Sequence, residues 1–214
     1  MRISALVATA GLLFASATAA NAAAFTNGDF EKGIDLPPGG FATVMGGDSS
    51  SIKGWTVIGN SVDYVDGYWQ AGSGERSIDL NGMGAGGLSQ TFDVVTGTEY
   101  MVRFLMSGNP DGADTQFLKA SVNSGANSSI AVFAWPSSAA NTRADMDWTE
   151  VFFTFTAGSS SATLTFESFF TSGFFGAAID NVSVVAVPLP MALPLFGAGL
   201  AALGLVSRRR KQAA

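Results

Sequence analysis

The sequence predicts an all-β fold, a jelly-roll β-sandwich, on three observations. Gly is abundant, with 26 residues among 214, and so is Phe, with 17, whereas the helix formers Leu, Glu and Lys are scarce in the central part of the chain. About ten short apolar or alternating runs are separated by turn residues at short intervals. No stretch between them has the apolar spacing of an amphipathic helix. Such a series of strands is typical of a two-sheet sandwich.

Each expected strand is bounded by residues that favour turns, mostly Gly, Asn, Pro and Ser. The ten strands are expected at residues 55–58, 62–65, 77–80, 88–95, 100–106, 117–122, 130–135, 148–156, 163–169 and 178–185. The Gly- and Pro-rich residues 33–51 are expected to form a loop over one end of the sheets. Short turns at 96–98 and 158–161 are expected to join their flanking strands into two hairpins.

Composition excludes several classes of function. Cys and His are absent, which rules out disulfides, Ser-His-Asp triads, Cys nucleophiles and typical zinc sites. Residues 25–187 hold six basic and all seventeen acidic side chains, a formal charge of −11. Because such a domain repels phosphate backbones, nucleic acid is not expected as a partner. Divalent cations and neutral polymers suit this charge better.

The N-terminal residues 1–24 have the pattern of a secretory signal peptide. Arg2 supplies the positive start, residues 5–17 are apolar, and small residues follow at 20–24. An uncleaved membrane anchor is the alternative interpretation of the same residues. The sequence therefore predicts export across the inner membrane, with the mature domain spanning residues 25–186.

The C-terminal end combines a Pro motif, an apolar run and a basic tail. The run at 189–206 is about the minimum length for a membrane helix, and the basic tail at 208–211 orients it with the domain facing outward. Residues 187–211 closely resemble a PEP-CTERM sorting signal of the VPLPA type, although Met191 stands where that variant has Ala. The resemblance implies a bacterium with an extracellular polysaccharide matrix and recognition by an exosortase. The expected sorting motif is Val187, Pro188, Leu189, Pro190 and Met191.

A second resemblance covers residues 25–186. Its motifs are NGDFE at 27–31, GWTVIGNSVDYVDGYWQ at 54–70, GERSIDLNG at 74–82, GLSQTF at 87–92, SGNPDG at 107–112 and IDNVSV at 179–184. In this order they resemble the choice-of-anchor C family and a plant cell-wall family known only as a domain of unknown function. The resemblance implies a galactose-binding-like sandwich, the architecture of many carbohydrate-binding modules. It also implies a non-catalytic, extracellular role near wall or matrix polysaccharides.

The resemblance further implies a structural Ca²⁺ that joins the first and last strands of the domain. Glu31 in NGDFE and Asp180 in IDNVSV match the positions of the acidic ligands. Ca²⁺ takes six to eight oxygen ligands, which two carboxylates with carbonyls and water can supply. The alternative is that both residues are ordinary polar positions.

The aromatic loop after the second expected strand is the candidate sugar-binding site. Sugar rings stack on aromatic faces, while carboxylates and amides bind the hydroxyls. The candidate residues are Tyr64, Tyr68 and Trp69, with Asp63, Asp66, Gln70 and Arg76 as hydrogen-bonding partners. The alternative is that Tyr64 and Trp69 pack in the core or under the loop.

No pair of acidic residues has a catalytic motif, so the chain is not expected to be an enzyme. The pairs considered for glycosidase chemistry are Asp145/Asp147, Asp63/Asp66 and Glu150/Glu167. The expected function is therefore an exported, non-catalytic carbohydrate-binding module of the cell surface or extracellular matrix. A purely structural matrix protein without a specific glycan ligand is the alternative.

Overall fold

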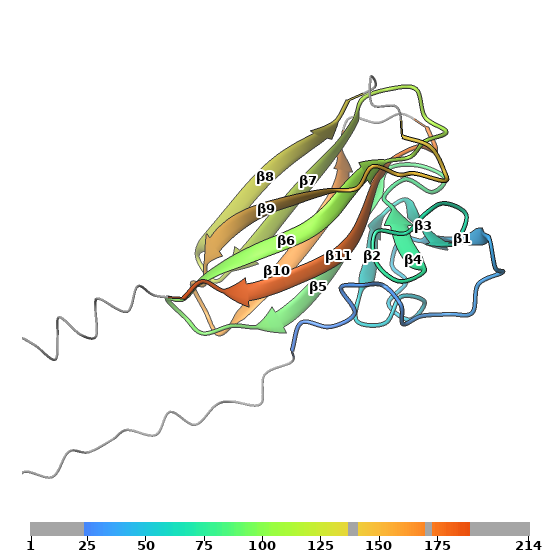
Figure 1. The fold of residues 1–214 in the computed structure, drawn as a ribbon. Coiled ribbons are helices and arrows are strands. Elements are labelled where there is room, and N and C mark those ends of the chain that lie inside the picture. The colour runs from blue at the N-terminus through green and yellow to red at the C-terminus, as the bar shows by residue number, and fades with distance from the viewer. Residues whose placement is uncertain (1–23, 137–140, 170–172, 189–214) are drawn as a thin grey trace, which may run out of the picture.

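The computed structural model describes residues 24–136, 141–169 and 173–188, which form two antiparallel sheets packed face to face (Figure 1). The predicted all-β sandwich is confirmed, and this part of the chain contains no α-helix. Within it, no helix is long and apolar enough to cross a membrane. The predicted signal peptide, apart from Ala24, and the predicted membrane segment lie outside the described residues.

The two sheets contain eleven strands, and every pair of neighbours is antiparallel. The first sheet has six strands in the order β1 (Gly40–Met45), β3 (Ser61–Asp66), β4 (Arg76–Asp79), β11 (Ala177–Ala186), β6 (Glu99–Gly108) and β9 (Thr149–Thr156). The second has five in the order β2 (Thr56–Gly59), β5 (Gly86–Asp93), β10 (Ser161–Phe169), β7 (Gln116–Ser124) and β8 (Asn127–Trp135).

The core lies between the sheets and follows from the two-residue period of each strand. Alternate side chains of a strand point to opposite faces, so the inward set forms one apolar cluster. Its largest fully buried members include Trp55, Phe92, Phe104 and Phe166. Trp55 and Phe30 both lie in this core, with exposed fractions of 1% and 0%.

The expected loop at residues 33–51 contains a strand, and that prediction was wrong in this part. Residues 40–45 form β1, which pairs with β3 at the edge of the first sheet. Val44 of β1 packs in the core, whereas Phe41 is 43% exposed on the opposite face. The Gly- and Pro-rich neighbours concealed a short alternating run that is typical of an edge strand.

The two expected hairpins were also wrong. β5 and β6 lie in different sheets, as do β9 and β10, so each short connection crosses from one layer of the sandwich to the other. The alternating pattern tells which residues face inward, but it is the same for a hairpin and for a crossing between sheets. β7 and β8, in contrast, do form a hairpin with a short turn, in which Gly125 takes a positive φ of 60°.

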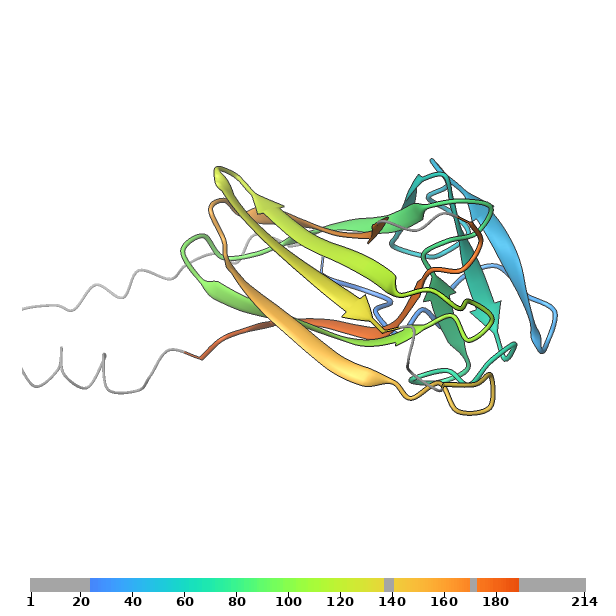
Figure 2. The ribbon, with the colours of Figure 1, turned by 90° about the horizontal axis from the view of Figure 1, so that it is seen from above.

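The two poles of the sandwich differ (Figures 1 and 2). β11 ends at the left pole of both views, which is where the described chain leaves the fold. β1, β3 and β4 lie at the right pole, together with the start of β11 and the end of β6. Since a strand rises about 3.3 Å per residue, the two ends of the ten-residue β11 are about 30 Å apart.

Candidate functional site: a cleft on the outer face

The outer face of the six-stranded sheet carries a row of polar side chains near the right pole. The register places Thr43 of β1 opposite Asp63 of β3, and Asp63 opposite Asp79 of β4. Their strand neighbours Val44, Val62 and Ile78 point into the core, so this row points outward. The outward direction of both carboxylates follows from the alternation in VDYV and SIDL.

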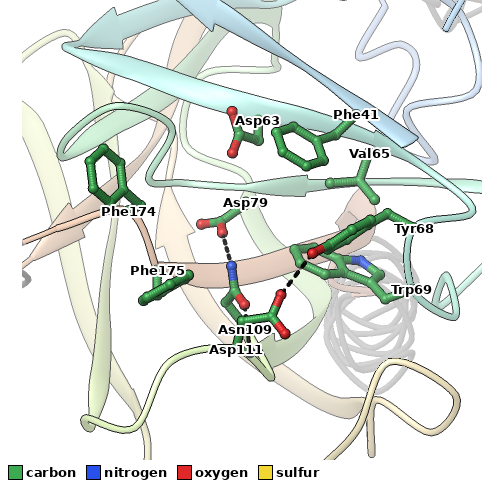
Figure 3. A pocket seen from close by; sticks show the side chains of 10 residues that line it. All are labelled: Phe41, Asp63, Val65, Tyr68, Trp69, Asp79, Asn109, Asp111, Phe174 and Phe175. Carbon is green, nitrogen blue, oxygen red and sulfur yellow. Dashed lines mark hydrogen bonds between the residues drawn. The ribbon is translucent and has the colours of Figure 1, made fainter. Parts of the chain in front are cut away.

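A cleft of about 100 Å³ lies over this row, and we call it the outer-face cleft (Figure 3). It is lined by Phe41, Asp63, Val65, Tyr68, Trp69, Asp79, Asn109, Asp111, Phe174 and Phe175. Figure 3 shows the carboxyl groups of Asp63 and Asp79 between two aromatic groups, with Phe174 and Phe175 on one side and Phe41, Tyr68 and Trp69 on the other. The cleft therefore combines acceptors for hydroxyl or amino groups with aromatic walls.

The aromatic side of the cleft is held by a small second core outside the sheet. Trp69 is only 4% exposed and packs with Val65, Met146 and Ala178. Its Nε1 donates to the Ser77 hydroxyl at 2.8 Å. This packing fixes the loop that carries Tyr68, and the Tyr68 ring packs edge-on against Phe41 at 5.2 Å between centroids.

Asp79 is fully buried, and its carboxyl group joins three segments. Its Oδ1 accepts the backbone N–H groups of Asn81 at 2.8 Å and Gly176 at 3.0 Å. Its Oδ2 accepts Nδ2 of Asn109 at 2.6 Å. Burial raises its pKa to about 8 despite these donors, with a smaller contribution from the charge of Asp63. Asp79 thus holds the segments that border the cleft in place, and its own carboxyl group is not exposed to solvent there.

Asp63 is the more accessible of the two acids. Its Oδ1 accepts the Thr43 hydroxyl at 2.6 Å, and partial burial raises the pKa of its carboxyl group. Like charges directly opposite on neighbouring strands destabilise each other. The charge of Asp63 therefore adds to the burial that raises the pKa of Asp79 to about 8, so Asp63 is the acid of this pair that ionises first.

The rim of the cleft is an ordered ion pair. Arg143 makes two hydrogen bonds to the Asp111 carboxylate, at 3.0 and 2.9 Å, and its guanidinium lies 4.2 Å from the centroid of the Tyr68 ring. The Tyr68 hydroxyl donates to the same carboxylate at 3.0 Å. This bidentate geometry holds the β6–β7 turn, which carries Asp111, against the aromatic loop.

Three of the predicted ligand residues form a network away from the outer-face cleft. The Tyr64 ring is fully buried, and its hydroxyl donates to the Phe30 carbonyl. Arg76 donates to the Tyr64 hydroxyl at 2.9 Å and pairs with Asp66 at 3.2 Å. The packing interpretation left open for Tyr64 is the one observed, and this network fixes the N-terminal motif on β3 and β4.

The structure brings Tyr68 and Trp69 to the outer-face cleft, while Gln70 lies beside it. Oε1 of the Gln70 side chain accepts the Met146 backbone N–H at 3.0 Å, and the backbone carbonyl of Gln70 accepts Nε1–H of Trp148 at 3.0 Å. Asp66, Trp69 and Gln70 also line a second, shallower depression together with Pro38, Gly67, Ala71, Gly74 and Glu75. The predicted site is thus divided between two neighbouring hollows and a buried network.

Glu31 and Asp180 converge on one loop, as the calcium hypothesis requires, but they bind its backbone. Oε1 of Glu31 accepts the N–H groups of Glu75 and Arg76, and Oδ2 of Asp180 accepts those of Gly72 and Ser73. Oδ1 of Asp180 accepts Asn181 N–H within a β-bulge. Burial raises the pKa of Asp180 to about 7. Among the described residues, no group of three or more acidic side chains is placed to hold a metal ion. Calcium stays a prediction.

The cleft contains residues that were not selected as ligands from the sequence. Asp79, Asn109 and Asp111 belong to motifs that were noted only for the family resemblance, and Phe174 and Phe175 lie between the last two expected strands. Asp63 and Asp79 carried a usable signal, because Asp is depleted in strands and both occupy outward positions of apolar runs.

The fold places the chain in a class: it is an all-β sandwich that resembles carbohydrate-binding modules in its architecture. TmCBM61, solved with β-1,4-galactotriose, has a TM-score of 0.50 and 17% identity to this chain, over 63% of this chain and 90% of its own. The CBM22-1 xylan-binding domain of Paenibacillus barcinonensis Xyn10C has a TM-score of 0.46 and 17% identity, over 73% of this chain and 100% of its own. An exo-β-1,3-galactanase of Phanerochaete chrysosporium has a TM-score of 0.42 and 17% identity, over 68% of this chain and 29% of its own. At these identities the likeness shows the fold alone.

The chain belongs to the family described as "Protein of unknown function (DUF642)", whose model matches residues 23–185. The expected similarity to a plant cell-wall family of unknown function is thereby confirmed. No curated protein matches the chain significantly. Membership in the choice-of-anchor C family and the PEP-CTERM signal stay predictions.

Proposed function

We propose that the chain is an exported, non-catalytic carbohydrate-binding module of the galactose-binding-like, jelly-roll type. In this proposal it associates with extracellular polysaccharide through the outer-face cleft. An exosortase recognises its C-terminal segment at the inner membrane, and the domain remains at the cell surface or in the matrix.

The observation that carries the proposal is the chemistry of the outer-face cleft. Three of its aromatic side chains, Phe41, Phe174 and Phe175, are 43%, 61% and 43% exposed. Large exposed aromatic residues that gather in one place mark interaction sites rather than ordinary surface. Acidic side chains lie among them, and this combination of flat rings and hydrogen-bond acceptors suits a sugar ring with its hydroxyl groups.

The burial of Asp79 supports a non-catalytic role. A glycosidase needs two carboxyl groups that both reach the glycosidic bond. Asp79 is 0% exposed and both of its oxygens accept N–H groups, so Asp63 alone faces a bound sugar from this pair. Of the other acids considered for catalysis, Glu150 pairs with Arg103 and Glu167 with Lys119, on different sheets.

The cleft and the point where the chain leaves the fold lie at opposite ends of the sandwich, which fits display on a surface. The outer-face cleft lies beside the start of β11, and the described chain leaves the sandwich about 30 Å away at the end of that strand. A C-terminal segment held at a membrane would therefore leave the cleft turned toward the matrix.

Binding of the full-length protein to extracellular polysaccharide tests the proposal. We expect saturable binding, a reduction of at least tenfold for Phe174→Ala/Phe175→Ala, and no change for Phe152→Ala. Phe152 is the matched control because it is 55% exposed on β9 and does not line the cleft. Weak, salt-sensitive adsorption that is equal for all three proteins would instead favour the structural matrix protein.

A further inference from the structure

The outer-face cleft holds negative charge that no basic side chain of the described chain neutralises. The four ion pairs of this part of the protein are Arg76–Asp66, Arg103–Glu150, Lys119–Glu167 and Arg143–Asp111. None of them includes Asp63 or Asp79. These two carboxyl groups are nevertheless direct cross-strand neighbours, whose Cβ atoms lie about 5 Å apart in such a pair. A cation bound in the cleft would give the carboxylate of Asp63 the counter-charge that none of these ion pairs supplies.

The aromatic walls favour an organic cation. Ammonium and guanidinium groups are attracted to the faces of aromatic rings within about 6 Å. The rim already shows this interaction, because the guanidinium of Arg143 lies 4.2 Å from the centroid of the Tyr68 ring. Phe41, Phe174 and Phe175 offer further exposed rings around Asp63 (Figure 3).

A hard metal ion fits the cleft less well. Ca²⁺ takes six to eight oxygen ligands, whereas both oxygens of Asp79 are already engaged by three N–H donors. Among the described residues no group of three acids suits a metal. An acidic sugar is also disfavoured, because its carboxylate would meet Asp63 in a partly buried site.

We propose that the outer-face cleft recognises the protonated amino group of a non-acetylated amino sugar within a polysaccharide, through Asp63 and the surrounding aromatic rings. This inference rests on the proposed function and specifies its ligand class. The volume of about 100 Å³ exceeds what a water needs but is below the size of a pocket for a whole small molecule. The cleft therefore takes the amino-bearing edge of one sugar unit, while the rest of the polymer stays outside.

Calorimetric titration of the full-length protein tests the inference. The probes are a glucosamine tetramer, its N-acetylated counterpart and a galacturonate tetramer at pH 6. We expect the amino tetramer to bind at least tenfold more tightly than the N-acetylated one, and the galacturonate tetramer most weakly. Asp63→Asn should bring the first two affinities within twofold of each other. Calcium chloride at millimolar concentration should not displace the amino sugar.

Glu99→Gln is the matched control, because it removes one exposed carboxylate at the opposite end of β6 and should keep the preference. If Asp63→Asn loses its fold by circular dichroism, Phe174→Ala replaces it, and we expect it to lower amino-sugar affinity at least fivefold. Equal binding of amino and N-acetylated sugars by the wild type would overturn the inference and leave the proposed function standing. Binding of no sugar at all would overturn both.

Discussion

Replacing Asp79 by Asn probes the acid that holds the cleft together. Asn keeps the shape of the side chain and an oxygen for the N–H groups of Asn81 and Gly176, but it cannot ionise. In the wild type, burial raises the pKa of Asp79 from the ordinary 3.8 to about 8. The folded state therefore retains a proton that the unfolded chain releases over this range.

The sign and size of the effect follow from proton linkage. A raised folded-state pKa gives stability that is complete below pH 3.8 and is lost as the pH rises toward 8. One pKa unit corresponds to about 1.4 kcal/mol. Between pH 5 and pH 8 the wild type should therefore lose about 4 kcal/mol of unfolding free energy through Asp79, and the Asn variant should lose none through this site.

Urea unfolding of both proteins at pH 5 and pH 8 measures this difference. We expect the free energy of unfolding of Asp79→Asn, relative to the wild type, to rise by about 4 kcal/mol over that interval. Asp147→Asn makes the same change on an exposed loop and should show no comparable shift. A shift below 1 kcal/mol for Asp79→Asn would refute the reasoning about the buried acid.

The partner of Asp79 provides a second arm of this test. In the single variant an amide donor replaces Oδ2 and faces Nδ2 of Asn109, which lies 2.6 Å from Oδ2 in the wild type. An unsatisfied buried donor costs about 1–3 kcal/mol. Adding Asn109→Asp restores a donor–acceptor pair, so the double variant should recover part of this loss at pH 5, with a coupling energy above 1 kcal/mol.

Three further predictions concern neighbouring features of the fold. Gly176→Ala should lower the unfolding free energy by several kcal/mol, because its Cβ would lie 2.5 Å from Oδ1 of Asp79; an unchanged urea midpoint would contradict this. If Ca²⁺ bridges Glu31 and Asp180, a chelator should lower the melting temperature of the wild type. Asp180→Asn should abolish that response. Equal melting curves of the wild type with and without chelator would remove the calcium hypothesis. Deleting residues 187–214 should release the exported protein from the membrane fraction, and a truncated protein that still sediments with membranes would count against the sorting prediction.

Local patterns predicted the strands well, because burial of one face imposes a period of two residues. The alternation in the VDYV and SIDL runs at 62–65 and 77–80 was sufficient to identify β3 and β4. The same pattern was not sufficient to assign strands to sheets. The connections from β5 to β6 and from β9 to β10 cross the sandwich, and that choice depends on contacts between distant segments.

The candidate site was predictable only in part, for a related reason. The aromatic loop at Tyr68 and Trp69 does border the cleft, and Asp63 was among the expected hydrogen-bonding partners. The role of Asp79 depends on the register of β3 with β4 and on donors from Asn109 and Gly176. Those donors lie 30 and 97 residues away, and a single sequence gives no signal for such long-range contacts.

A crystal structure of the protein with a bound oligosaccharide would test the central claim most directly. We expect density for a sugar unit in the outer-face cleft, between Asp63 and the rings of Phe174 and Phe175. A sugar seated instead in the shallower depression around Asp66, Gln70 and Glu75, with the outer-face cleft holding only solvent, would contradict it.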